Sequence, residues 1–267
     1  MKVLIVGDRG YIGSVLVPLL AQKHDVAGYD IEENIRYVES FRAACKGKDA
    51  VIYLASVSNN DYCIAHPDEA QRINQDCFPP LVEAAKDVSH FIYASSVAAY
   101  GSGENLTENY LLIPTTIYGE GKKFCEDYLK TQRVPYTIVR AATVCGWSPH
   151  MRWDTTVNKM VQDGMRGEIT VNGGEQKRCH VHINDLCEFY SMILDKAENE
   201  TYNVVWMNQQ LNHTAYTVAA MTHAKVITKE RTDNRSYTVS GEKAERLLGW
   251  KPIRSIANAV QDILNHV

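Results

Sequence analysis

Tyr118 and Lys122 stand four residues apart in the segment Tyr118-Gly-Glu-Gly-Lys122. On a helix this spacing puts the phenol and the ammonium on one face. A phenol, with an ordinary pKa near ~10, is a poor base at neutral pH, but a neighbouring cation stabilises the phenolate. Such a pair can take a proton from a hydroxyl while a hydride leaves the same carbon, or protonate a developing alkoxide. We therefore predict that Tyr118 is the proton-transfer group and Lys122 its partner.

A Tyr and a Lys at this spacing are common by chance, so the alternative interpretation is an ordinary pair on a helix surface. Two further features favour the catalytic interpretation. Gly119 and Gly121 are poor helix residues, so something other than helix stability retains them. Ser95 and Ser96 follow a buried apolar strand at residues 91–94. They would offer a hydroxyl at the carboxyl edge of a parallel sheet, where ligands of open α/β sheets bind.

A glycine-rich turn follows the predicted strand at residues 2–6, whose last four residues are apolar, and opens the first predicted helix. A dinucleotide pyrophosphate needs a tight turn, close backbone approach and N–H groups at a helix N-terminus, where the helix dipole favours anions. The spacing G-x-x-G-x-x-G is a variant of the usual dinucleotide pattern, and its alternative is a purely structural turn. The residues that we predict to contact the cofactor here are Gly7, Gly10, Tyr11, Ile12 and Gly13.

The choice between NAD and NADP depends on charged residues near this turn. Asp30 ends the second predicted strand. A carboxylate there can accept hydrogen bonds from both ribose hydroxyls of NAD, and it repels the extra phosphate of NADP. Arg9 and Arg36 are the counter-argument, since either can neutralise that phosphate. We favour NAD and keep NADP as the alternative.

Short apolar runs alternate with helix-like stretches through the first half of the chain, which is typical of an α/β fold with a parallel sheet flanked by helices. We expect a nucleotide-binding domain over residues 1–146. Residues 147–267 would form a smaller lobe that partly returns to the sheet. The predicted strands cover residues 2–6, 26–29, 50–54, 91–94 and 136–139, and the predicted helices cover 12–23, 118–131 and 68–86, the last interrupted at Pro79-Pro80.

Composition limits the classes of function. The formal net charge of −4 gives no electrostatic basis for binding nucleic acid or an anionic membrane surface. No stretch approaches the roughly 18 apolar residues of a membrane span. The seven cysteines form no C-x-x-C pair and are odd in number, which favours reduced thiols over a disulfide framework. We expect a cytoplasmic protein.

His180 and His182 alternate along a predicted strand, beside Cys179 and Asp185. Their side chains would share one face, but no third metal ligand with a firm spacing accompanies them. We predict no metal site.

Eight segments, taken in order along nearly the whole chain, resemble the extended short-chain dehydrogenase/reductase family, which contains nucleotide-sugar epimerases, dehydratases and reductases. Each segment is modestly specific alone, and the specificity lies in their order. They are Gly7–Gly13, Asp49–Ala55, Asn74, Ser95–Gly101, Pro114 with Tyr118 and Lys122, Arg140–Gly146, and Arg178–Asp185 followed by Leu248–Pro252.

The resemblance implies a Rossmann-type, doubly wound parallel sheet with a small C-terminal substrate lobe. It implies that Ser96 hydrogen-bonds the reacting oxygen, that Tyr118 is the acid/base, and that Lys122 also anchors the nicotinamide ribose. Further cofactor contacts would come from Leu54, Ala55 and Ser56.

The resemblance also implies substrate contacts. Arg178 matches an arginine that binds the diphosphate of a nucleotide-sugar, and Arg235 is a second candidate for that role. A guanidinium suits phosphate geometry, and the alternative for both arginines is a solvated surface charge. Thr143 stands where the family often has a substrate-binding asparagine.

The function expected from this resemblance is a nucleotide-sugar epimerase, similar to the 4-epimerases. The alternatives are a net oxidoreductase, such as a 4-keto-sugar reductase or a sugar dehydrogenase, and a cofactor-sensing protein without catalysis. Because the serine, tyrosine and lysine are all present, we rank the last alternative lowest. The resemblance further implies a homodimer formed through the helix that bears Tyr118, with which apolar Phe124 and Leu129 are compatible.

Overall fold

A six-stranded sheet forms the centre of the first structural unit in the computed structural model, which describes residues 1–30, 37–196, 198–230 and 235–267. Neighbouring strands pair in parallel from β2 through β1 and β3 to β4. The predicted parallel α/β fold is therefore confirmed. In spatial order the strands are β10 (Glu200–Val204), β6 (Tyr136–Ala141), β4 (His90–Ser96), β3 (Ala50–Tyr53), β1 (Lys2–Val6) and β2 (Asp25–Tyr29).

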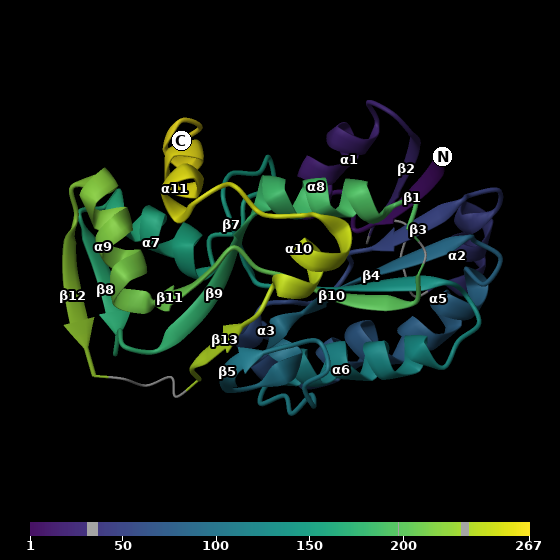
Figure 1. Cartoon of the computed structure of the whole chain (residues 1–267), viewed down its shortest axis with the longest axis horizontal. Coiled ribbons are helices and arrows are strands. Elements are labelled where there is room, and N and C mark those ends of the chain that lie inside the picture. The colour runs from purple at the N-terminus through teal and green to yellow at the C-terminus, as the bar shows by residue number, and fades with distance from the viewer. Residues whose placement is uncertain (31–36, 197, 231–234) are drawn as a thin grey trace. The chain divides into compact units, whose positions relative to one another are not determined.

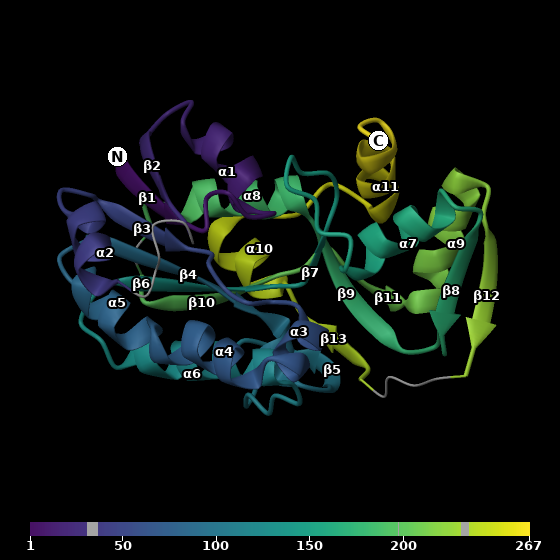
Figure 2. The same cartoon turned by 180° about the vertical axis from the view of Figure 1, so that it is seen from behind.

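Helices cover both faces of this sheet (Figures 1 and 2). Both faces of β1, β3 and β4 are thereby buried, which explains why these strands are apolar runs without alternation. One face packs with Phe78, Phe91 and Leu129 in a single hydrophobic core. The helices on that face are α2 (Val38–Cys45), α5 (Phe78–Ala84) and α6 (Ile117–Lys130), and those on the other are α1 (Gly13–Leu20) and α8 (Ile183–Ile193).

The helix predicted over residues 68–86 is divided, as the two prolines suggested, but the irregularity begins before them. The helix α4 (Pro67–Gln71) runs into a π-helical turn, η2 (Arg72–Asp76), and α5 starts afresh at Phe78. The proline pair falls in the first turn of α5, where a backbone N–H would have no acceptor within the helix. The short helix α3 (Asn60–Ala65) precedes this region.

The second structural unit is built from three small sheets and four helices of the described chain. The helices α7, α9 and α11 enclose a separate hydrophobic core that includes Val161, Val218 and Val260. The sheets are β11 (Met207–Gln210), β9 (Lys177–His182) and β7 (Thr143–Cys145); β12 (Lys225–Lys229) and β8 (Glu168–Asn172); and β13 (Tyr237–Val239) and β5 (Gly103–Leu106). The helices are α7 (Thr156–Gly164), α9 (Leu211–Thr222), α10 (Glu242–Leu248) and α11 (Ile256–Leu264).

The two units exchange segments, so they differ from the single boundary expected after residue 146. Unit 1 comprises residues 1–101, 111–140 and 187–202, and unit 2 comprises residues 102–110, 141–186 and 203–267. The exchange has a structural reason. The strand β5 leaves the first half to pair with β13, and β10 returns from the second half to complete the six-stranded sheet.

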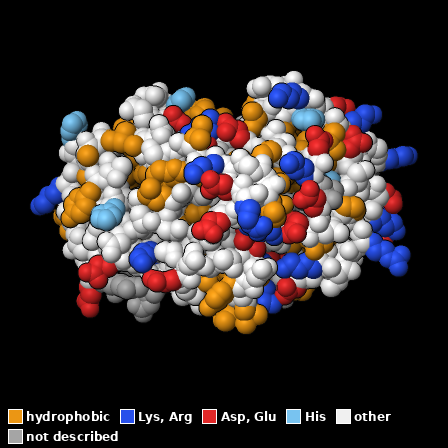
Figure 3. Space-filling view, viewed as in Figure 1, with side chains coloured by type: hydrophobic (Ala, Val, Ile, Leu, Met, Phe, Trp, Pro, Cys, Tyr) orange, Lys and Arg blue, Asp and Glu red, His pale blue; other side chains and the backbone are white. Residues whose placement is uncertain are grey.

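Among the described residues, no helix combines the length and the apolar character needed to cross a bilayer. On the face of the molecule shown in Figure 3, acidic and basic side chains are interspersed.

Candidate active site

The glycine turn joins β1 to α1 through close backbone contacts in unit 1. Gly7 has a φ of +87°, a conformation that favours glycine, and its N–H donates to the carbonyl of Tyr29 at 2.8 Å. A Cβ on Gly13 would lie 2.1 Å from the Gly7 oxygen, and a Cβ on Gly7 would lie 3.0 Å from the Ala55 nitrogen. The turn is therefore packed against the segment after β3, which holds the predicted cofactor residues Leu54–Ser56.

Two carboxylates flank this turn. Asp30, at the end of β2, accepts a hydrogen bond from the backbone N–H of Arg9 through Oδ2 at 2.8 Å. Asp8 lies over β2, since a Cβ on Gly28 would come within 2.0 Å of its Oδ2. A carboxylate can accept several hydrogen bonds, which is the chemistry that ribose hydroxyls require. Of the two arginines named in the cofactor argument, Arg9 is exposed within the turn and Arg36 lies outside the described residues.

The Tyr–Lys pair lies near the start of α6. Thr116 caps this helix by accepting the Gly119 N–H at 3.0 Å. Lys122 is only 4% exposed, and its ammonium donates to the Ala94 carbonyl at 2.8 Å. That ammonium lies 5.5 Å from the centre of the Tyr118 ring, which is partly exposed. Because an ammonium has three donors, Lys122 can hold β4 and still serve a ribose or a phenolate.

Both glycines of the Tyr–Lys segment occur where the backbone of α6 touches another element. A Cβ on Gly119 would lie 2.6 Å from the carbonyl oxygen of Ala98. A Cβ on Gly121 would lie 3.2 Å from the Cβ of Asn74. Close packing thus explains why these two poor helix residues occur in α6.

Ser96 stands at the end of β4 and is partly exposed. Its hydroxyl accepts the N–H of Ala98 at 3.2 Å and so caps a 3-10 turn, η3 (Val97–Tyr100). The contact between Gly119 and Ala98 joins this turn to α6. Tyr118, Lys122 and Ser96 are thus held by two elements of unit 1 that pack directly on each other.

Asn74 is a residue that motif reasoning about the chemistry missed and that only the family resemblance included. It is buried in the π-helical turn η2. Its side-chain oxygen accepts the Val57 N–H at 2.8 Å and the Ser56 hydroxyl at 3.0 Å, and its amide donates to the Val57 carbonyl at 2.8 Å. Asn74 thereby fixes the segment after β3 that was predicted to line the cofactor.

The residues predicted to bind substrate, other than Ser96, gather in unit 2. Arg178 is 7% exposed, which excludes the alternative of a solvated surface charge. Its Nη1 donates to the carbonyls of Lys177 at 3.0 Å and Arg235 at 2.5 Å. Its guanidinium lies 5.3 Å from the centre of the Tyr237 ring.

Tyr237, which sequence reasoning did not single out, connects these residues. Burial raises the pKa of Tyr237 to about 12, while the positive charges of Arg178 and Arg235 and a hydrogen bond with Thr143 oppose that rise. The tyrosine has no motif of its own in the sequence. Its partners are separated in the chain and meet only because β7, β9 and the segment before β13 come together.

His180 and His182 point inward from β9 of unit 2. Burial, aided by the charge of Arg178, lowers the pKa of His180 to about 4. The Nε2 atom of His182 lies 3.1 Å from a carboxylate oxygen of Asp262. Within the described ranges, no three or more His, Cys, Asp or Glu side chains are grouped to hold a metal ion.

Known proteins resemble this chain over the segments that form the site. The sequence profile of the NAD dependent epimerase/dehydratase family matches residues 3–205. The chain belongs to this family. The match covers all the elements that carry the Tyr–Lys pair, the glycine turn and Ser96.

Curated members of the epimerase/dehydratase family resemble the chain over most of their length. A UDP-glucose 4-epimerase of Lactobacillus helveticus is 26% identical, covering 94% of this chain and 92% of that protein. A dTDP-glucose 4,6-dehydratase of Escherichia coli K12 is 22% identical, covering 98% of this chain and 91% of that protein. The solved UDP-glucose 4-epimerase of Thermotoga maritima, in complex with UDP-glucose, shares the fold with a TM-score of 0.90 at 22% identity, covering 99% of both chains.

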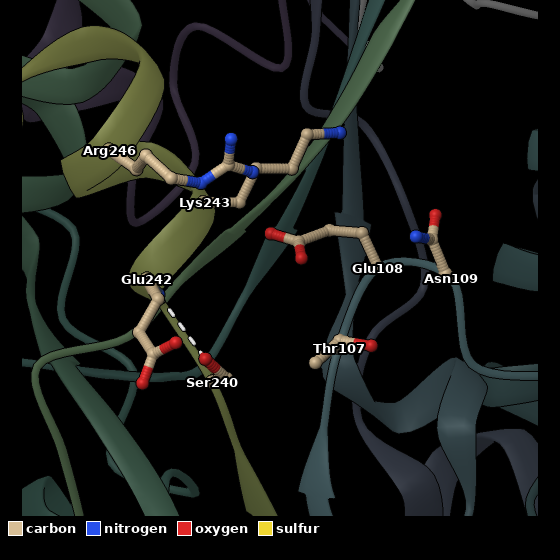
Figure 4. Close-up of a pocket in the computed structure, with 7 residues that line it drawn as sticks. All are labelled: Thr107, Glu108, Asn109, Ser240, Glu242, Lys243 and Arg246. Carbon is tan, nitrogen blue, oxygen red and sulfur yellow. Dashed lines mark hydrogen bonds between the residues drawn. The ribbon is translucent and has the colours of Figure 1, made fainter.

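Unit 2 contains a hollow of about 250 Å³ that is lined by residues other than the predicted catalytic and binding residues (Figure 4). Two cations of α10, Lys243 and Arg246, contribute to it together with the acidic Glu108 and Glu242. Their charges balance, and none of the residues predicted to act in catalysis or binding lines it. Its lining consists of Thr107, Glu108, Asn109, Ser240, Glu242, Lys243 and Arg246.

Proposed function

We propose that the protein is an NAD-dependent nucleotide-sugar 4-epimerase. The observation that carries this proposal is the Tyr118–Lys122 pair on α6, whose helix packs on the turn that begins at Ser96. The names of the relatives support the substrate class, since UDP-glucose 4-epimerases occur among them.

Each of the three side chains has one task. Ser96 hydrogen-bonds the reacting hydroxyl and orients it. Tyr118 takes the hydroxyl proton and later returns it to the oxygen. Lys122 keeps a positive charge beside the Tyr118 ring and so favours the phenolate. The glycine turn and Lys122 would hold NAD, which would supply the acceptor and donor for the hydride of the substrate carbon.

Dehydratases of the family place an Asp-Glu pair directly after the catalytic serine or threonine, and these carboxyl groups eliminate water. Here Val97 and Ala98 occupy those positions. Neither side chain can transfer a proton. We therefore favour epimerisation over dehydration, although dehydratases also occur among the relatives.

A net oxidoreductase is the second candidate. One relative, 27% identical over 76% of this chain, is a GDP-6-deoxy-D-talose 4-dehydrogenase of Aggregatibacter actinomycetemcomitans. Such an enzyme uses the same proton transfer but exchanges its cofactor with solvent. The two reactions differ in net redox change, which makes them separable by experiment.

NAD fits the acidic surroundings of the glycine turn better than NADP. Asp30 and Asp8 both bring carboxylates to this turn, and these would repel the additional phosphate of NADP. In unit 2, the Arg178 guanidinium would bind the diphosphate of the substrate, because guanidinium geometry matches phosphate. The Tyr237 ring holds the guanidinium in place.

We further propose a homodimer that forms through α6, in a protein of the cytoplasm. Phe124 on α6 is 40% exposed, which supports its place in such an interface. Leu129 is fully buried in the core of unit 1, so its expected compatibility with an interface is wrong. All seven cysteines are free thiols, which agrees with a reducing compartment.

The deciding experiment supplies a panel of UDP-, dTDP-, GDP- and CDP-hexoses and follows both product formation and absorbance at 340 nm. A 4-epimerase inverts one hexose without a net absorbance change. Stoichiometric loss or gain of NAD(P)H would support the oxidoreductase instead. Mass spectrometry of the purified protein identifies a retained cofactor, and retention of NADP would overturn the choice of NAD.

A further inference from the structure

A buried ion pair lies directly beneath the turn that carries Ser96. Arg140, on β6, donates from Nη2 to Glu126 Oε2 at 2.6 Å and from Nε to Oε1 at 2.9 Å. The two side chains are 2% and 0% exposed. Burial lowers the pKa of Arg140, but the hydrogen bonds and charge of Glu126 outweigh burial and raise it above its usual value. The pair is therefore a charged, bidentate contact in the interior of unit 1.

Each member of this pair also holds one hydroxyl, and the two hydroxyls bracket the turn η3. Ser95, immediately before Ser96, donates to Glu126 Oε1 at 2.5 Å. At the other end of η3, the Tyr100 hydroxyl accepts from Arg140 Nη1 at 2.7 Å, and the guanidinium lies 4.8 Å from the centre of the Tyr100 ring. Both ends of the short turn are thus attached to the same ion pair.

The ion pair is also tied to the Tyr–Lys helix. Tyr118, Lys122 and Glu126 follow one another at four-residue intervals along α6 and so lie on successive turns of one face. Lys122 binds the carbonyl of Ala94, and Glu126 binds the hydroxyl of Ser95. Consecutive residues at the end of β4 are therefore bound by consecutive turns of the helix.

We propose that Glu126 and Arg140 are positioning residues, which fix Ser96 relative to Tyr118 by clamping both ends of the turn between them. We call the Glu126–Arg140 pair the clamp. This inference rests on the proposed function, because proton transfer is the reason that Ser96 and Tyr118 must be held in a fixed relation. A buried ion pair contributes little net stability compared with apolar packing, but its directional hydrogen bonds define a single geometry. Reaction rates are sensitive to displacements of reacting groups well below the size of an atom.

The test removes the hydroxyls and keeps the ion pair, because loss of Glu126 or Arg140 would itself threaten folding. The variants are Ser95→Ala and Tyr100→Phe. Tyr128→Phe is the matched control, since its hydroxyl, on the same helix, makes a long contact of 3.5 Å to the Pro79 carbonyl, away from η3. Hydrogen exchange is measured on the purified protein without substrate. Each test variant should speed exchange of the η3 amides about tenfold, as expected for one lost hydrogen bond, and the control should not.

Kinetics on the hexose chosen by the panel provides the second readout. Ser95→Ala and Tyr100→Phe should each lower kcat about tenfold with KM within about twofold, since geometry rather than binding is disturbed. In a Ser96→Ala background the same changes should lower kcat no further, because the clamp acts through Ser96. A general structural effect would instead persist in that background.

Two results would overturn the clamp. One is exchange in both test variants equal to that of Tyr128→Phe. The other is an undiminished kinetic effect in the Ser96→Ala background. Failure of the proposed function is separately visible, because the hexose panel would then show no inverted hexose, or a stoichiometric change at 340 nm, whatever the exchange data show.

Discussion

Replacing Gly119 by alanine separates the two elements that hold the catalytic side chains. The new Cβ would lie 2.6 Å from the Ala98 carbonyl oxygen and 3.1 Å from the Pro114 Cβ, whereas ordinary contact begins at 3.4 Å. Because the nearest obstacle is backbone, α6 and η3 must move apart by about 0.8 Å, the difference between 2.6 and 3.4 Å. A displacement near 1 Å between reacting groups costs up to about 100-fold in rate, so we expect kcat to fall roughly 30-fold or more.

The free energy of unfolding of Gly119→Ala provides a second, independent test of this contact. Alanine is favoured over glycine in a helix by about 1 kcal/mol, but overpacking typically costs about 1–3 kcal/mol. We therefore expect a net loss of about 1 kcal/mol in Gly119→Ala, measured by urea unfolding. Gly121→Ala is the internal comparison, because its Cβ would lie 3.2 Å from the Asn74 Cβ and needs a shift of only a few tenths of an ångström. Its kcat should fall less than about fivefold.

The reasoning would be refuted by a Gly119→Ala protein that turns over like the wild type and unfolds at a higher urea concentration. Helix propensity alone would then explain the position, and the contact between α6 and η3 would have no role in catalysis. A larger loss in Gly121→Ala than in Gly119→Ala would also contradict the geometry.

Three further predictions follow from buried charges and from the cofactor site. Glu126→Ala should lower the free energy of unfolding by about 3–5 kcal/mol in a denaturant titration, because it leaves a buried cation unpaired. Arg152→Ala, which breaks a partly exposed ion pair, should lower it by under about 1 kcal/mol. Equal losses would refute the interpretation of Glu126 as a buried partner. The pKa of His180, about 4 in the fold, lies below its ordinary value, so unfolded chains bind more protons and stability falls as pH drops from 6.5 towards 4. Between pH 7.5 and 5 this loss of stability is about 2 kcal/mol. The variant His180→Phe should lack the loss, and the variant His213→Gln, at an exposed histidine, should keep it. An equal pH dependence of unfolding in the wild type and both variants would argue against the lowered pKa of His180. Asp30→Ala should weaken NAD relative to NADP about tenfold or more in titration calorimetry, and an unchanged ratio would remove Asp30 from the ribose site.

Features that depend on neighbouring residues were predictable from the sequence. The strand predicted at residues 2–6 from its unbroken apolar run has the bounds of β1. The helix predicted from the Tyr–Lys spacing differs from α6 by one residue at each end. The glycine pattern similarly located the tight turn before α1. Strand runs, helix spacing and turn glycines are local signals, because each reflects the backbone of one short segment.

Features that depend on residues far apart in the chain were not predictable in this way. Glu126 and Arg140 look like ordinary charged residues in the sequence, yet they are buried against each other because α6 packs on the sheet. Tyr237 gains its place beside Arg178 only when β13 approaches β9. The exchange of segments between the units likewise depends on strand pairing, which no local pattern of residues specifies.

Tyr118→Phe tests the central claim most directly, because it removes one oxygen and leaves the helix intact. The measurement is kcat on the hexose selected by the panel, with retained cofactor quantified by mass spectrometry in the same preparation. Proton transfer by a positioned side chain contributes about 10²–10⁴-fold to a rate, so we predict a loss in that range with cofactor still bound. Turnover within about twofold of the wild type would contradict the assignment of Tyr118 as the acid/base.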